Sequence, residues 1–312
     1  MTGNGFETVN ELLDDVNVRL LELLKGSVDL IVNDLSPDQL DRVARTPGYR
    51  VERRPGHNYV YMAFNLRDRF LSDRRVREAI ARALDRGAII EYLLHGGATL
   101  ATGLLPPGHW AYQPDVPSYP FDPRAAAELL DRAGYPDPDG SGPRTRFRLS
   151  LETPSSELGL QQAAVIQEQL GRIGIGLDIR AYEWPTFYDD LKAGRFQVIV
   201  SNWTEISDPD IYRLRFHSLY VPPAGFNRGF YRNLRVDRLL ESGASTLDEV
   251  TRRRIYGEIQ RILARDLPYV SLWHRDVAVA ERDRVRGFQL TSGADFLPLR
   301  RVTLGADGRN RG

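Results

Sequence analysis

The residues of this 312-residue chain whose types could support catalysis are scattered along it singly. The five histidines show none of the paired spacing that is typical of metal sites: they are His57, His95, His109, His217 and His274. The absence of cysteine excludes disulfides, thiolate metal sites and cysteine nucleophiles. No GxSxG, HExxH or P-loop motif occurs, and no GxGxxG follows a predicted strand. The residues therefore predict no enzymatic activity, no cofactor and no metal site.

Trp203 points to binding rather than to catalysis. It stands at the carboxyl end of a strand that the alternation of apolar residues predicts over 196–200. A large aromatic ring supplies flat apolar area at little cost in rotamer entropy, which suits the wall of a binding site. We therefore predict that Trp203 contacts a ligand, in preference to a role in core packing alone.

The segments before Trp203 predict the sheet that positions it. Alternating apolar residues predict strands over 147–151 and 175–179, and helical periodicity predicts helices over 156–173 and 185–193. This β-α-β-α-β order favours a partly parallel sheet covered by helices, because crossover connections between parallel strands are right-handed. Open sheets of this kind bind ligands at the carboxyl ends of their strands.

A second strand-like segment, residues 59–65, places Tyr61 and Asn65 on one face, and both are candidate ligand contacts. For Tyr61, core packing is the stronger alternative. Asp73 is placed to cap a following helix, and the strand predicted over 49–54 leads to a hinge at Pro55–Gly56.

The remaining segments give further periodic patterns. Helices are expected over 6–25, 37–44, 85–94, 125–133, 236–242 and 248–265. The first of these includes Leu13, and Asp122 caps the helix over 125–133. Strands are expected over 28–32 and 269–279. Two further strands, over 285–290 and 302–304, are expected to complete the sheet of a first lobe.

Several motifs occur together in a specific combination. They are Phe64–Asn65, Asp73, Arg75–Val76–Arg77, Ala79–Ile80, Asp85–Arg86, Ser207–Asp210 and Asn227–Tyr231. This combination of motifs resembles that of the extracytoplasmic solute-binding proteins of ABC importers, in the peptide/nickel type of family 5. The resemblance extends roughly from Leu20 to Phe288.

The resemblance implies an α/β fold of the type II periplasmic-binding-protein kind, with the second lobe complete and the first partial. Residues 1–57 would form part of lobe I, residues 58–269 lobe II, and residues 270–312 the return to lobe I. On this interpretation the chain starts in the middle of the family's fold, as a fragment or a truncated gene. The N-terminal residues also lack the pattern of a secretory signal.

The implied function is to bind a peptide or a related small solute between two lobes, to close by hinge rotation, and to deliver the ligand to an ABC importer permease. The location would be periplasmic or otherwise extracytoplasmic, with membrane contact only through the permease. Because 42 basic and 42 acidic residues cancel, no nucleic-acid partner is expected. Three alternatives stay open: the sensor half of a regulator, a non-binding remnant, and an enzyme whose site forms only in the folded chain.

The resemblance also implies site residues. Trp203 and the residues beside it, Asn202 and Thr204, would line the ligand site. Dipeptide-binding members carry an aspartate three residues beyond the tryptophan, where this chain has Ile206. A deletion in the alignment would bring Asp208, two residues further on, into that role, but Asp208 equally suits a turn cap. Those members also carry an arginine near the end of an earlier strand, where this chain reads Leu151–Pro154 without arginine. Without these two anchors a zwitterionic dipeptide is doubtful as the ligand, and we expect the aromatic wall at Trp203 to matter more than any single charge.

Overall fold

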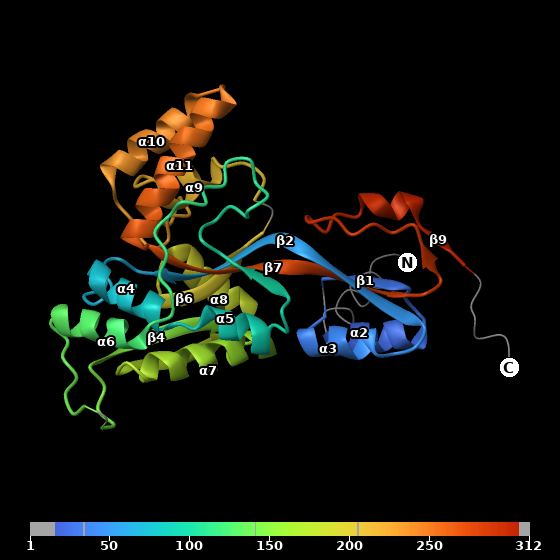
Figure 1. Cartoon of the computed structure of the whole chain (residues 1–312), viewed down its shortest axis with the longest axis horizontal. Helices are drawn as coiled ribbons and strands as arrows, with labels where there is room; N and C mark the ends of the chain where they lie inside the picture. The colour runs from blue at the N-terminus through green and yellow to red at the C-terminus, as the bar shows by residue number, and fades with distance from the viewer. Residues whose placement is uncertain (1–15, 34, 141, 205, 306–312) are drawn as a thin grey trace, which may run out of the picture. The chain divides into compact units, whose positions relative to one another are not determined.

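The computed structural model describes residues 16–33, 35–140, 142–204 and 206–305, and it divides into two compact units (Figure 1). The first unit takes its described residues from 1–57, 94–99 and 275–312, and the second takes them from 58–93 and 100–274. Strands β2 (Tyr49–Phe64) and β7 (Tyr269–Arg282) each begin in one unit and end in the other. That these units are the two lobes of a binding protein, with boundaries at 57/58 and 269/270, stays a prediction.

In the first unit, helix α2 (Val16–Lys25) ends at Gly26, whose φ of 89° is a conformation that glycine adopts without strain. Strand β1 (Leu30–Val32) pairs antiparallel with β7. Helix α3 (Pro37–Ala44) begins with a capping box formed by Ser36 and Gln39. The part of the first predicted helix that includes Leu13 lies outside the described residues.

The strand predicted over 49–54 is longer than expected, because β2 runs continuously through Pro55 and Gly56. The hinge at these two residues stays a prediction. At Gly56 the backbone approaches its neighbour so closely that a Cβ would lie 2.5 Å from the carbonyl oxygen of Arg275, which explains a glycine inside a strand.

The C-terminal strands β8 (Val285–Arg286) and β9 (Thr303–Leu304) also differ from the prediction. Among the described residues they pair with each other in a separate two-stranded sheet and do not extend the sheet that contains β1. Gly287 has a φ of 81°, and this left-handed residue ends β8 after two residues.

The second unit holds the predicted sheet. Strand β6 (Val198–Trp203) pairs antiparallel with β2 and parallel with β4 (Phe147–Pro154), which in turn pairs parallel with β5 (Ile175–Tyr182). The expectation of a partly parallel sheet is confirmed. One helix lies between β4 and β5 in the chain, and another lies between β5 and β6. These helices form the crossover connections that parallel strands need.

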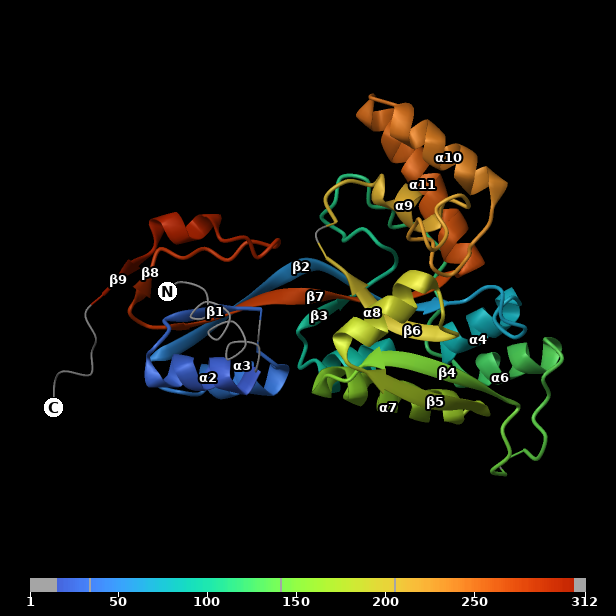
Figure 2. The same ribbon diagram turned by 180° about the vertical axis from the view of Figure 1, so that it is seen from behind.

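Helices α7 (Glu157–Gly171) and α8 (Trp184–Ala193) cover opposite faces of this sheet, as Figure 2 shows. The α8 side chains Phe187 and Leu191 pack into the same apolar cluster as Tyr61 of β2. The other helices and the remaining strand are α4 (Arg74–Ala83), α5 (Arg86–Ala88), η1 (Ile89–Leu93), α6 (Pro123–Arg132), α9 (Ile211–Phe216), α10 (Leu234–Ser245), α11 (Glu249–Asp266), η2 (Leu297–Arg301) and β3 (Ala98–Leu100).

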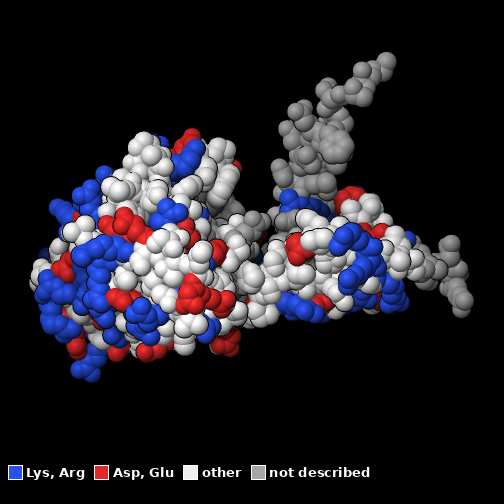
Figure 3. All heavy atoms as spheres, turned by 90° about the horizontal axis from the view of Figure 1, so that it is seen from above, with Lys and Arg blue, Asp and Glu red and all other residues white. Residues whose placement is uncertain are grey.

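The predicted helix caps are confirmed. The carboxylate of Asp73 accepts a hydrogen bond of 2.8 Å from the backbone N–H of Arg75, and that of Asp122 accepts one of 2.9 Å from Ala125. On the face drawn in Figure 3, acidic side chains lie among the basic ones, consistent with the equal numbers of the two charges.

Candidate ligand-binding site

Trp203 and Tyr61 lie on one face of the sheet because of the register between β6 and β2. Tyr59 lies opposite Trp203 and Tyr61 lies opposite Ser201, so Tyr61 and Trp203 are diagonal neighbours across the strand pair. Their ring centroids are 5.8 Å apart and their planes differ by 12°. Two strands thus supply a flat aromatic surface at the carboxyl end of β6.

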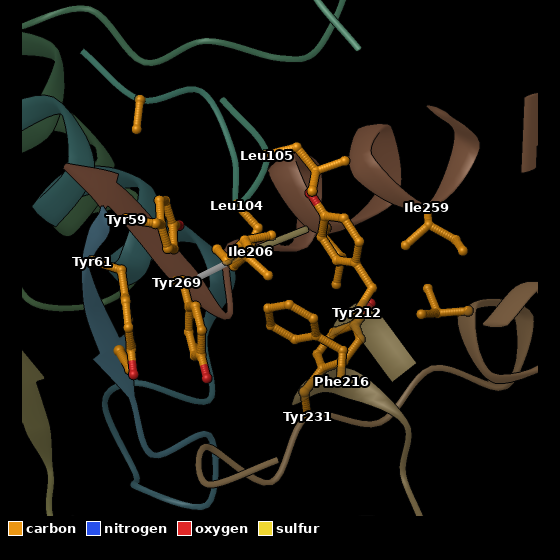
Figure 4. Packing of buried hydrophobic residues seen from close by; sticks show 14 of the residues in the cluster. Tyr59, Tyr61, Leu104, Leu105, Ile206, Tyr212, Phe216, Tyr231, Ile259 and Tyr269 are labelled. Atoms are coloured by element: carbon orange, nitrogen blue, oxygen red, sulfur yellow. The ribbon is translucent and has the colours of Figure 1, made fainter. Parts of the chain in front are cut away.

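Tyr269 of β7 extends this surface. Its ring centroid lies 4.5 Å from that of Tyr61, in a stacked arrangement, and Figure 4 shows the two rings side by side. Tyr61 is fully buried, which raises the pKa of its phenol well above the usual value, while burial raises the pKa of Tyr269 to about 12. Both phenols are therefore neutral hydrogen-bonding groups at physiological pH. The preference for core packing at Tyr61 agrees with this burial.

Arg215 and Arg228 lie against this aromatic surface, and the sequence analysis missed both. The guanidinium carbon of Arg215 lies 3.4 Å from the centroid of the Trp203 ring, and that of Arg228 lies 5.0 Å from it. Phe226 meets the Trp203 ring edge-on at 6.4 Å and lies 4.6 Å from the Arg215 guanidinium. Burial lowers the pKa of Arg215, yet the side chain keeps its charge near neutral pH.

A sequence signal for Arg215 did exist. In helix α9 the buried residues are Tyr212, Arg215 and Phe216, which are three and four positions apart and so share the apolar face of the helix. An arginine on the apolar face of a helix is buried on folding, and its guanidinium group then needs a hydrogen-bonding or aromatic partner. Arg228 stands in the loop between α9 and α10, where no periodicity shows which residues turn inward.

The other predicted site residues lie apart from this surface. Asn202 and Thr204 are exposed, and Asn202 points to the opposite face of β6 from Trp203, since successive strand residues alternate. Asn65 follows the far end of β2, where its amide nitrogen donates to the carbonyl oxygens of Gly194 and Phe196 at 3.3 and 2.9 Å. As ligand contacts, these three residues stay predictions.

Asp208 has structural partners in the described part of the chain. Its carboxylate accepts a hydrogen bond of 2.8 Å from the backbone N–H of Asp210 and forms an exposed ion pair of 3.1 Å with Arg252. This geometry is that of a turn cap, one of the two roles that the sequence analysis left open. Ile206 is buried in the apolar cluster, so the position expected for an ammonium anchor is occupied by core packing.

Glu152 occupies the strand end where the sequence analysis looked for an arginine. It lines a hollow of about 480 Å³ together with Arg180 and Arg195. Burial, and next to it the charge of Asp190, raises the pKa of Glu152 to about 7. Its Oε2 atom has no hydrogen-bond partner in the described structure.

Among the described residues, no three or more His, Cys, Asp or Glu side chains form a group that could hold a metal ion. Within the same residues, no helix combines the length and the apolar character that crossing a membrane requires. The geometry is that of a largely buried cluster of stacked rings, two buried cations and neutral phenols, and its role in binding stays a prediction.

Comparison with known families identifies the class. The model of the bacterial extracellular solute-binding proteins, family 5 (middle region), matches residues 8–219, and this chain belongs to that family. The resemblance inferred from the motifs is thereby confirmed.

Individual relatives are similar in sequence and fold. The chain is 30% identical over 279 residues to probable di/tripeptide-binding protein 5 of Pseudomonas aeruginosa, covering 88% of this chain and 51% of the relative. It is 27% identical over 285 residues to heme-binding protein A of Haemophilus influenzae, covering 90% of this chain and 50% of the relative. The chain thus spans about half the length of the curated relatives that it matches.

Solved structures confirm the fold class. The oligopeptide-binding protein AppA of Bacillus subtilis, solved in complex with a nonapeptide, superposes with a TM-score of 0.82 at 24% identity, covering 94% of this chain and 59% of that one. The type II binding-protein architecture predicted from the sequence is therefore present, in part.

Proposed function

We propose that this chain binds a peptide or a related small solute as part of the binding component of an ABC importer, and hands it to a membrane permease without chemistry of its own. Family membership supports the class, since the relatives that the chain matches are named as binding proteins. An extracytoplasmic location follows from the same proposal.

The observation that carries the proposal is the aromatic surface of Tyr61 and Trp203 at the carboxyl end of β6. Flat rings give contact area that tolerates different side chains, which suits a binder of peptides or other small solutes. The named ligands of the relatives range from di- and tripeptides to heme, so the ligand class is a proposal drawn from the more numerous peptide binders.

The test is calorimetric titration of the chain with pooled di-, tri- and longer peptides, followed by Trp203→Ala. Removing the indole should weaken binding by about tenfold, corresponding to about 1–2 kcal/mol for a buried aromatic anchor. Trp184→Ala is the matched control, because that indole is 55% exposed on α8 and its loss should leave affinity unchanged.

The outcomes separate the alternatives. If no pool binds, the proposed function is wrong for this chain. If peptides bind and Trp203→Ala has no effect while Asp208→Asn abolishes binding, a charge at Asp208 rather than the aromatic surface holds the ligand.

A further inference from the structure

The second unit contains two buried arginines whose hydrogen-bonding groups are left unused in the described structure. Arg215 is 9% exposed and Arg228 is 2% exposed. The Nε and Nη1 atoms of Arg215 and the Nε and Nη2 atoms of Arg228 are buried without a hydrogen-bond partner. Each side chain thus keeps two of its donor nitrogens free in a water-excluded setting.

Arg77, in the same unit, shows how this protein satisfies a buried arginine that serves the fold. Its guanidinium group donates four hydrogen bonds of 2.5–2.9 Å, to the carbonyl oxygens of Leu71, Ser72, Asp266 and Leu267. An unpaired buried cation costs free energy, because burial removes its hydration and supplies no replacement. The contrast with Arg77 indicates that the partner of Arg215 and Arg228 comes from outside the fold.

A further donor of the same surface is unused. The Trp203 Nε1–H is buried without a hydrogen-bond partner among the described residues. The charged guanidinium groups of Arg215 and Arg228 lie 3.4 and 5.0 Å from the Trp203 ring, so all these donors gather around one indole. The surface is therefore rich in donors, and the described residues supply no anionic acceptor to them.

We propose that Arg215 and Arg228 form an anion-binding subsite beside Trp203, which holds a carboxylate or a similar oxyanion of the bound solute. The proposal rests on the proposed function and adds the chemistry of the ligand to it. Planar guanidinium groups suit carboxylates because two parallel N–H donors match two oxygens. The anion reaches the donors by displacing Phe226, the 39% exposed ring that packs on Arg215 and Trp203.

The subsite changes the expectation drawn from the missing dipeptide anchors. The strand end where an arginine was sought carries Glu152, whereas Arg215 comes from α9 and Arg228 from the loop after it. The charge that fixes the solute is therefore supplied after β6 rather than before it.

The test compares four probes on the 312-residue chain: trialanine, trialanine amide, glutarate and inorganic phosphate, titrated at constant ionic strength. Trialanine should bind about 30-fold more tightly than its amide, and Arg215→Met combined with Arg228→Met should remove that preference. Stabilisation by glutarate or phosphate alone, lost in the double variant, would assign the anion to a free oxyanion instead of a peptide terminus. Arg213→Met is the matched control, since Arg213 lies on the same helix and already pairs with Asp210 at 2.7 Å.

A second readout separates ligand binding from a purely structural role. In the absence of any probe, the double variant should have an unchanged or higher melting temperature, because methionine keeps the apolar stem and removes an unpaired buried charge. A melting temperature lowered by several degrees would show that the arginines serve the fold, and would overturn the proposal.

The remaining outcomes also decide. Equal binding of trialanine and its amide, retained in the double variant, overturns the subsite and leaves the proposed function standing. Failure of every peptide pool together with stabilisation by glutarate overturns the peptide function and leaves the subsite standing. Failure of all four probes overturns the subsite.

Discussion

Arg77→Met tests how strongly one buried side chain holds the second unit together. Arg77 lies on α4 and is 6% exposed. Its guanidinium group bonds Leu71 and Ser72 before the helix, and Asp266 and Leu267 at the end of α11. Burial lowers the pKa of Arg77 to about 10, so the group is charged at neutral pH and its hydrogen bonds are charge-assisted.

The magnitude follows from what methionine can replace. It keeps most of the apolar volume of the stem but no donor, so four carbonyl oxygens lose their partner. Hydrogen bonds to a charged group contribute about 1.5–3 kcal/mol each and do not add fully, since the carbonyls share one partner. Removing one side of such a buried charged network costs about 3–5 kcal/mol. For a unit of this size the melting temperature should fall by about 6–20 °C.

The assay is thermal and urea unfolding followed by circular dichroism, with Arg74→Met as the control. Arg74 lies three residues earlier on α4, where its half-exposed side chain pairs with Glu78 at 2.8 Å. Such a surface pair contributes at most about 1 kcal/mol, so the control should unfold close to the wild type. If the two variants lose similar stability, the hydrogen bonds of Arg77 do not hold α4 to the end of α11.

Two more substitutions test individual features. Because burial raises the pKa of Glu152 from 4.5 to about 7, the folded chain binds this proton more tightly than the unfolded chain, and stability falls as pH rises through this range. Glu152→Gln should therefore match the wild type near pH 4 and exceed its free energy of unfolding by about 1–3 kcal/mol at pH 8; urea titrations that show a pH-independent difference would contradict this. Gly56→Ala should lower stability by about 1–3 kcal/mol, because the new Cβ would lie 2.5 Å from a backbone oxygen, whereas Gly171→Ala, with open space around it, should not destabilise α7. Equal melting temperatures for the two alanine variants would show that the backbone of β2 shifts at residue 56 and accommodates the Cβ atom.

Local signals in the sequence predicted most of the second unit. These signals depend only on residues close together in the sequence, and the structure contains the elements that they indicate. They are the alternation through residues 147–151 and 175–179 and the helix caps at Asp73 and Asp122. The end of the strand predicted over 49–54 was placed too early for a different reason. Residues that usually end strands are tolerated in β2, where the close approach of Arg275 requires a glycine.

For the candidate site, the sequence predicted the aromatic part, and the helical spacing of Arg215 gave a signal that the analysis did not use. Trp203 and Tyr61 come together through strand register, and register follows from the alternation that the sequence displays. The positions of Arg215 and Arg228 do not follow from strand register. Whether Arg215 is solvated or buried depends on the path of the chain after β6, and Arg228 is brought to the same indole by a loop without periodicity.

This difference bears on how ligand choice is encoded in the chain. The wall of the site sits on paired strands, where a substitution must respect register and the packing of neighbouring rings. The cations sit on α9 and the following loop, outside the strand pairs, so their identity is not constrained by the register of β2 and β6. If Arg215 and Arg228 hold an anion, ligand chemistry here is set after β6, and the absence of an arginine from the segment Leu151–Pro154 is no argument against a solute that carries a carboxylate. A chain with the same aromatic wall and an apolar residue at 215 should then prefer an uncharged ligand. Titrating Arg215→Met with trialanine and its amide tests this, and an unchanged preference for trialanine would contradict it.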